Sequence, residues 1–142
     1  MTVTATTPKS MKLLAVILLL GVAARPVLAF NGHSVQEGAL TLSVNPIQEV
    51  RQFDEPQTVK ATIRNSGSTR IDVALRMDDL MDEWYAVGSS EASVSIEPGE
   101  NRSVAFQVAA GHGAVSALCP VHVYARFNDG VQERTAHAVR IF

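Results

Sequence analysis

Four carboxylates within the segment MDDLMDEW are the first side chains whose spacing could support chemistry. They are Asp78, Asp79, Asp82 and Glu83. Calcium binds hard oxygen ligands, and a loop of this composition could supply several of them. The ligand spacing and the glycine of an EF-hand are missing, however, and an acidic run between two strands is usually solvated. These residues are candidate metal ligands at most, and the sequence predicts no bound metal and no other cofactor.

Two histidines flank a possible hairpin turn and form the other candidate site. A two-residue turn on Asp129-Gly130 would place His122 directly opposite His137. A three-residue loop, with Gly130 in a bulge, would instead place His122 opposite Ala136. Only the first register creates a two-histidine surface, which could hold a soft metal or titrate near about pH 6.5. Otherwise the two histidines are polar side chains on an outer face, and no third ligand is visible in the sequence.

The possible nucleophiles have no motif around them. Cys119 is the only cysteine, so it cannot form an internal disulfide. It shares the phase of Val121 and Val123 in an alternating strand, which predicts a small buried apolar residue; an intermolecular disulfide is the alternative. His122 falls on the opposite face of that strand and cannot activate the thiol. Ser116 lacks the G-x-S-x-G elbow. The sequence therefore predicts no catalytic residue and no enzyme.

The N-terminal segment Met11–Ala29 has the features of a secretory signal peptide. A lysine precedes an apolar run from Leu13 to Ala24, and small residues precede Phe30, so we expect cleavage after Ala29. A retained signal anchor is the alternative, but a bilayer span needs roughly 18 apolar residues, and Arg25 and Pro26 end the run earlier. Whether Met1 or Met11 is the true start stays open. We assign residues 1–29 to the signal peptide and expect an exported protein, periplasmic, cell-surface or secreted.

Removal of these residues leaves a chain long enough for one domain with one core. The remaining chain has nine basic and fourteen acidic side chains, a formal charge of −5. It contains no basic patch interleaved with aromatic residues, so nucleic acid and anionic membranes are not expected partners. It also has no second apolar run long enough to span a bilayer, and we expect no membrane span after signal cleavage.

Alternation of apolar and polar residues indicates strands along most of this chain. The runs are Leu40–Val44, Val59–Ile63, Ile71–Met77, Val94–Ile96 and Val104–Val108, with a further strand around Cys119–Phe127 and another before Phe142. Turn signals lie between the runs in NSGS, EPGEN and NDG. The pattern predicts an all-β fold, an immunoglobulin-like two-sheet sandwich of about seven antiparallel strands. We assign residues 30–38 to a short linker and 39–142 to the sandwich, with an inter-sheet core of Ile71, Val73, Leu75, Met77, Val104, Phe106, Val121 and Val123.

Three stretches resemble exported bacterial β-sandwich modules. They are VKATIRNSGSTRIDVAL, EWYAVGSSEASVSIEPGENRSVAFQV and LCPVHVYARF, which together cover about Leu40 to Phe142. The pattern resembles the NEW3 and CARDB-like families, which are non-catalytic modules attached to secreted glycosidases and other extracellular proteins. Those families share no catalytic residue, so the resemblance implies a structural or adhesive accessory and transfers no site to this chain.

Two functional classes remain for such a sandwich. The favoured one is a non-catalytic structural or interaction module of an exported protein. It could be the N-terminal piece of a larger secreted protein, because the chain stops at Phe142 while still in strand phase. The alternative is a module that binds carbohydrate or another ligand, for which Trp84, Tyr85 and Tyr124 are the available aromatic residues. Trp84 in the core would favour a scaffold, whereas Trp84 and Tyr85 on one open face would favour binding.

Overall fold

Buried and exposed side chains alternate along the longer strands. In β4 (Ile71–Asp78), every second residue from Ile71 to Met77 is buried, and the residues between them face solvent. Successive side chains of a strand point to opposite faces, so one face of the strand lies in the core. The computed structural model describes residues 32–114 and 119–141. In that part of the chain the fold is all-β.

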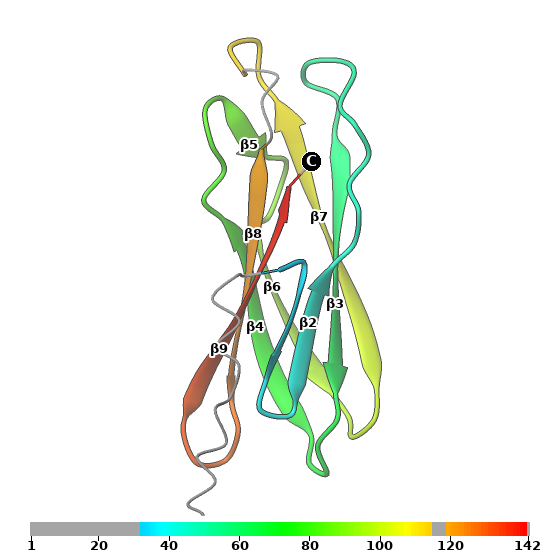
Figure 1. The fold of residues 1–142 in the computed structure, drawn as a ribbon, viewed down its shortest axis with the longest axis vertical. Helices are drawn as coiled ribbons and strands as arrows, with labels where there is room; N and C mark the ends of the chain where they lie inside the picture. The colour runs from blue at the N-terminus through cyan, green and yellow to red at the C-terminus, as the bar shows by residue number, and fades with distance from the viewer. Residues whose placement is uncertain (1–31, 115–118, 142) are drawn as a thin grey trace, which may run out of the picture.

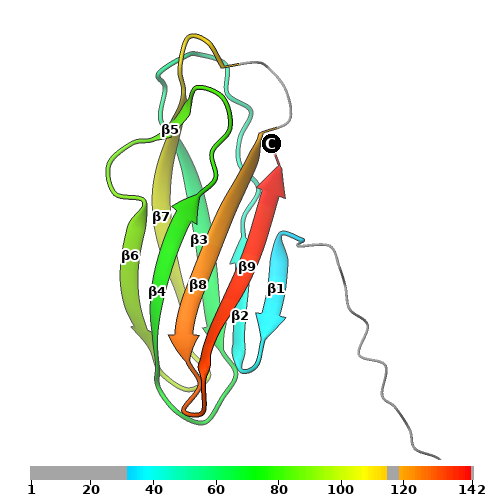
Figure 2. The same cartoon turned by 90° about the vertical axis from the view of Figure 1, so that its left-hand side faces the viewer.

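Two antiparallel sheets pack face to face as a sandwich (Figures 1 and 2). The first sheet contains, in spatial order, β1 (Ser34–Glu37), β2 (Leu40–Val44), β3 (Gln57–Asn65), β7 (Asn101–Ala110) and β5 (Trp84–Ala86). The second sheet contains β6 (Glu91–Ile96), β4, β8 (Pro120–Asn128) and β9 (Glu133–Ile141). The two-sheet sandwich expected from the sequence is therefore confirmed.

The described residues form nine strands, whereas the sequence indicated about seven. The two additional strands are the shortest: β1 has four residues and β5 has three. Strands of this length hold too few alternations to be recognised from a period-two pattern. β1 also lies inside segment 30–38, which the sequence indicated as a linker, and it pairs with β2 from Ser34↔Ser43 to Glu37↔Leu40.

The core lies between the two sheets. Of the eight residues expected there, seven are buried: Ile71, Val73, Leu75, Met77, Phe106, Val121 and Val123. Val104 is half-buried and packs against the same cluster. Burial of these aliphatic and aromatic side chains removes apolar surface from water, which is the main favourable contribution to folding.

Asn65 is the one buried polar side chain among the described residues. Its Nδ2 donates hydrogen bonds to the carbonyl oxygens of Thr69 (2.7 Å) and Ile96 (3.1 Å), and its Oδ1 accepts one from the Gly67 N–H (2.9 Å). A buried polar group is tolerated when its hydrogen-bonding capacity is used, as it is here. Because Asn65 ends β3 and Ile96 ends β6, this side chain links the two sheets beside the NSGS turn.

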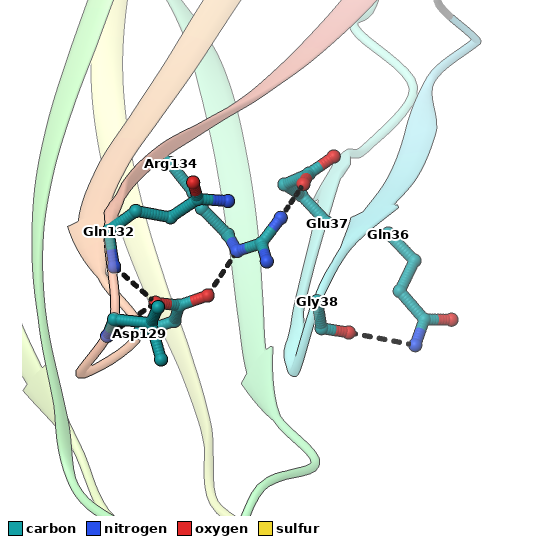
Figure 3. Close-up of polar contacts among 7 residues, drawn as sticks. Gln36, Glu37, Gly38, Asp129, Gln132 and Arg134 are labelled. Carbon is teal, nitrogen blue, oxygen red and sulfur yellow. Dashed lines mark hydrogen bonds and ion pairs between the residues drawn. The ribbon is translucent and has the colours of Figure 1, made fainter.

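Arg134 links the two sheets at another margin (Figure 3). Its guanidinium, from β9, forms an ion pair with Glu37 Oε1 of β1 at 2.7 Å and a second ion pair with Asp129 in the β8–β9 loop. β1 belongs to the first sheet and β9 to the second, so Arg134 joins them along the side where β1 and β9 lie together.

The β8–β9 hairpin differs from both registers that the sequence suggested. Asn128 pairs with Glu133, which leaves a four-residue loop at 129–132, and His122 lies opposite Val139 instead of His137 or Ala136. Asp129 explains the longer loop, because its Oδ1 accepts hydrogen bonds from the N–H groups of Val131 (2.9 Å) and Gln132 (2.8 Å). An Asp side chain that bonds backbone groups two and three residues ahead stabilises such a turn.

The connections gather at the two ends of the sandwich (Figure 1). One end, called the loop end below, carries the long connection 45–56, the segment 79–83 and residues 111–114 after β7. The opposite end carries the short turns 66–70, 97–100 and 129–132. Neither described stretch of the chain contains a helix long and apolar enough to cross a membrane.

Candidate functional surfaces

Side chains from three separate segments meet at the loop end around Asp54. Its Oδ1 accepts a hydrogen bond from the Tyr85 hydroxyl at 3.0 Å, and its Oδ2 lies 3.2 Å from His112 Nε2. The ring of Phe53 contacts the ring of His112, with centroids 5.2 Å apart. The Asp54 N–H donates to the Ala110 carbonyl at 2.8 Å, which fixes this part of connection 45–56 to the end of β7. We call Phe53, Asp54, Tyr85 and His112 the loop-end cluster.

This cluster is open to solvent and partly apolar. Phe53 is 52% exposed and Tyr85 is 42% exposed, and Met81, on the neighbouring segment 79–83, is 50% exposed. The hydrogen bond to the Asp54 carboxylate raises the pKa of Tyr85, because the carboxylate stabilises the protonated phenol. The cluster therefore presents exposed aromatic side chains, of which Tyr85 and His112 are held by Asp54.

Among the described residues, the Asp54–His112 pair has no nucleophile beside it. The His112 side chain is 82% exposed, and within the described residues no serine, threonine or cysteine side chain is hydrogen bonded to it. A triad needs a nucleophile within hydrogen-bond reach of its base. The geometry instead suits Asp54 to orienting the two rings of Tyr85 and His112.

A second group of side chains crosses the outer face of the second sheet. Arg76 of β4, Tyr124 of β8 and His137 of β9 are consecutive cross-strand partners. The Tyr124 and His137 rings stack with centroids 4.2 Å apart, and the Arg76 guanidinium lies 5.4 Å from the Tyr124 ring. The Tyr124 hydroxyl donates to Asp79 Oδ2 at 2.5 Å, and this hydrogen bond raises the pKa of Tyr124. Because neighbours from both adjoining strands flank its ring, Tyr124 is poorly placed to stack on a sugar.

The structure brings the two candidate histidines together, although the register expected for them is wrong. His122 Nδ1 lies 2.9 Å from His137 Nε2. His137 sits opposite Tyr124, two residues from His122 on the same face, and such diagonal neighbours are within reach of long side chains. Burial, followed by the nearby His122, lowers the pKa of His137. In the described ranges, no group of three or more His, Cys, Asp or Glu side chains is arranged to hold a metal ion.

The four carboxylates of the acidic segment have different surroundings. Asp78 pairs with Arg76 at 2.7 Å, and Asp79 accepts the Tyr124 hydrogen bond. Glu83 binds the chain after β7: its Oε2 accepts the Gly113 N–H at 2.7 Å and its carbonyl accepts the Gly111 N–H at 2.9 Å. A Cβ at Gly111 would lie 2.9 Å from the Glu83 carbonyl, so this approach requires glycine.

Asp82 completes the acidic segment. It adopts a positive φ of 53° in the tight connection that precedes β5, and Asp79 does so as well, with a φ of 57°. Asp tolerates this backbone conformation better than most residues do, because its short polar side chain can hydrogen bond locally. The positive φ at positions 79 and 82 therefore gives a local structural reason for an aspartate at each of them.

The remaining sequence candidates have clear positions. Cys119 is 4% exposed and its pKa is raised by burial, which agrees with a buried apolar residue. Trp84 is half-buried and packs against the core, whereas Tyr85, its neighbour on β5, is exposed. Trp84 and Tyr85 therefore do not share one open face. Ser116 and the signal segment 1–29 lie outside the described residues.

Sequence reasoning identified the histidine pair but missed the loop-end cluster. Tyr85 was among the aromatic residues noted in the sequence, but Phe53, Asp54 and His112 carried no motif. A possible signal was the aromatic–acidic pair in the longest connection of the chain, since long loops on compact sandwiches are often functional.

Comparisons with known proteins give the fold but no family. The sequence matches no protein-family model and no curated protein. It is similar in structure to a FixG-related protein from Vibrio parahaemolyticus, with 15% identity, a TM-score of 0.50, and coverage of 73% of this chain and 94% of that chain. It is also similar to the GAE domain of GGA2p from Saccharomyces cerevisiae, with 13% identity, a TM-score of 0.56, and coverage of 77% and 95%. At this level of identity, the likeness concerns the β-sandwich fold alone.

Proposed function

We propose that this chain is a non-catalytic interaction module of an exported protein, and that it contacts a partner through the loop end. The observation that carries the proposal is that three exposed apolar or aromatic side chains, Phe53, Met81 and Tyr85, lie on segments at that end, two of them in the loop-end cluster. Grouped apolar exposure marks contact surfaces, and loops held by a rigid scaffold are common positions for binding residues.

The hydrogen bonds around Asp54 support this role. Asp54 holds the Tyr85 hydroxyl and the His112 imidazole, and its own N–H is bonded to Ala110. Side chains that are already ordered lose less conformational entropy on binding, so the same contacts give a higher affinity. Tyrosine adds a large apolar surface with few rotatable bonds, which makes it effective at protein interfaces.

Carbohydrate binding receives less support from the aromatic residues. Trp84 packs against the core, and both adjoining strands supply side chains that flank the ring of Tyr124. Tyr85 is the one of these three that remains exposed. A protein partner that covers Phe53, Met81 and Tyr85 together fits the surface better than a sugar stacked on a single ring.

Export belongs to the same proposal and is supported by the sequence of Met11–Ala29. The resemblance to NEW3 and CARDB-like modules supports a place in a larger secreted protein. Mass spectrometry of the exported protein tests this part: we expect an N-terminus at Phe30. An exported chain that retains Leu13–Leu20 would contradict signal cleavage.

Site-specific crosslinking tests the contact surface. A photoreactive amino acid replaces Phe53 in one variant and Val131 in another, and each variant is exported by its native host before irradiation. Val131 is a matched control, because it is an exposed apolar residue in the turn at the opposite end. We expect a discrete crosslinked partner from position 53 alone. Equal crosslinking from both positions, or from position 131 alone, would refute the loop end as the contact surface.

A turnover assay tests the absence of catalysis. Residues 30–142, assayed against glycoside, ester and peptide substrates, should show no activity. Activity that disappears in His112→Ala or Asp82→Ala would overturn the proposal. Activity that survives both substitutions and separates from the protein on further purification would be a contaminant and would leave the proposal standing.

A further inference from the structure

The four edge strands of this sandwich are not equally protected against pairing with a strand of another molecule. The edges are β1 and β5 in the first sheet and β6 and β9 in the second. Edge strands carry unpaired backbone groups, and proteins usually shorten, cover or charge them. β5 has three residues, whereas β1 and β9 lie together, joined by the Val139 N–H to Gly32 carbonyl bond (3.3 Å) and by Arg134. Among the described edge strands, β6 is therefore the one that is neither very short nor covered, and it forms one margin of the sandwich in Figure 2. In the same part of the chain, β7 is also unpaired on its outer side from Asn101 to Phe106, because β5 pairs only with Val108–Ala110.

The register of β6 determines which of its backbone groups face outward. The Met77 N–H donates to the Ser90 carbonyl, and the pairing continues from Arg76↔Glu91 to Ile71↔Ile96. Hydrogen-bonded and non-hydrogen-bonded pairs alternate along an antiparallel ladder. The even-numbered residues of β6 therefore bond to β4, whereas Glu91, Ser93 and Ser95 direct their N–H and C=O groups to the open edge.

Only some of these outward N–H and C=O groups of β6 have hydrogen-bond partners within the described part of the chain. The Ser89 hydroxyl accepts the Glu91 N–H at 3.1 Å and donates to the Glu91 carbonyl at 2.8 Å. Within the described residues, the outward N–H and C=O groups of Ser93 and Ser95 have no such partner. No proline and no lysine interrupts β6, so the usual obstacles to pairing with another strand are few.

We propose that β6 pairs antiparallel with β6 of a second copy of this chain, on a two-fold axis at Ser93, so that the two four-stranded sheets become one continuous sheet. Ser93 then faces Ser93 of the second copy, and Glu91 faces Ser95 of the second copy, twice by symmetry. A two-fold interface uses the same patch on both subunits, which a strand edge paired about its own centre satisfies. The surface lies apart from the loop end, so this inference does not depend on the proposed function.

Charge complementarity favours the second copy as the occupant of this edge. Arg70 lies over the end of β6, where its Nη2 donates to Ser95 Oγ at 2.8 Å and forms an ion pair with Asp72 at 3.3 Å. The Ser95 hydroxyl also donates to Asp72 Oδ1 at 2.5 Å, so a carboxylate from the second copy would share Arg70 with Asp72. In the proposed register, Glu91 of the second copy is directly opposite Ser95 on this same outer face. Its carboxylate thus comes within reach of the Arg70 guanidinium, and the symmetry creates the same ion pair a second time.

Neighbouring registers are less favourable than the one centred on Ser93. A shift of two residues in one direction would bring Glu91 opposite Glu97 of the second copy, and like charges that face each other across strands are destabilising. A shift in the other direction would pair Ser95 with Ser89, outside β6. The Ser93 register also places the half-buried Ala92 beside Val94 of the second copy, which removes more apolar surface from water.

Sedimentation equilibrium tests the dimer. A strand-edge contact is small, so we expect residues 30–142, which contain every described strand, to dimerise with a dissociation constant of roughly 10 µM to 1 mM. Glu91→Arg places an arginine beside Arg70, and Arg70→Glu places a glutamate beside Glu91; each should weaken the dimer by about tenfold or more. The double variant Glu91→Arg with Arg70→Glu restores the opposite charges and should recover the affinity to within about threefold.

Matched variants separate this contact from general effects of charge or folding. Glu133→Arg makes the same charge change on β9, at the far edge of the same sheet, and should leave dimerisation unchanged. Ser93→Pro removes the central N–H and should abolish the dimer; a thermal melt shows whether that variant folds, and the charge variants decide the question if it does not. A wild-type protein that stays monomeric at about 1 mM, or a double variant no better than either single variant, would overturn the proposal. Dimerisation that is lost on Phe53→Ser instead would place the contact at the loop end and would also overturn it.

Discussion

Phe106 is the residue at which the predicted core is most directly tested. It lies in β7 opposite Val59 of β3 and is 2% exposed, between the two sheets. Phe106→Ala removes the aromatic ring and leaves a cavity that the surrounding strands can fill only in part. Substitutions of this kind cost about 3–5 kcal/mol of unfolding free energy. Domains of this size have about 5–15 kcal/mol in total, so the variant should fold but with much of its stability lost.

The expected shift in melting temperature follows from the size of the domain. Unfolding entropy of about 2.1 cal/mol/K per residue gives roughly 0.23 kcal/mol/K for about 110 residues, so the melting temperature should fall by about 13 to 22 °C. Urea titration of residues 30–142 measures the free energy directly. Phe53→Ala is a matched control, since it removes the same ring from an exposed position and should cost less than about 1 kcal/mol. A Phe106→Ala cost below about 1 kcal/mol, or equal costs for both variants, would refute the assignment of Phe106 to the core.

Three further predictions concern ionisable and reactive groups. Hydrogen bonds from Arg134 and from backbone N–H groups of the loop lower the pKa of Asp129 to about 2. Its contribution to stability should therefore be complete above about pH 4 and lost as the pH falls toward 2, so Asp129→Asn should destabilise the protein at about pH 6 but not near pH 2 in denaturant titrations. Burial and His122 lower the pKa of His137, so the folded state favours the neutral imidazole. The stability that follows from keeping His137 neutral should be lost as the pH falls below the ordinary pKa of about 6.5, because the unfolded chain then binds the proton more readily. His137→Gln should therefore make the unfolding free energy less dependent on pH between about 7.5 and 5. An unchanged pH profile in this variant would contradict the prediction. Cys119 is buried and its pKa is raised, so it should resist alkylation until the protein unfolds, and a reductant should leave the melting temperature unchanged. Rapid alkylation under native conditions would show that the thiol is accessible.

Much of the fold could be predicted because a half-buried strand alternates apolar and polar residues within a few positions of the sequence. Alternating residues in Ile71–Met77 and around Phe106 indicated which side chains enter the core, and the structure buries them. β1 and β5 were not predicted. These short strands have too few residues for a clear alternation, and they form because they pair with β2 and β7. The β8–β9 loop was misjudged because the hydrogen bonds of the Asp129 side chain, and not the Asp-Gly pair alone, determine its length.

The sequence by itself determined the all-β class, the core-facing phase of the longer strands and the burial of Cys119, since each follows from residue types a few positions apart. Only the tertiary structure decided which distant side chains meet. Asp54, Tyr85 and His112 come from three separate segments, and their contact depends on how those segments end beside one another in the first sheet. The open edge at β6 is also a tertiary property, because a strand becomes an edge only when the order of strands in the sheet leaves one of its sides unpaired.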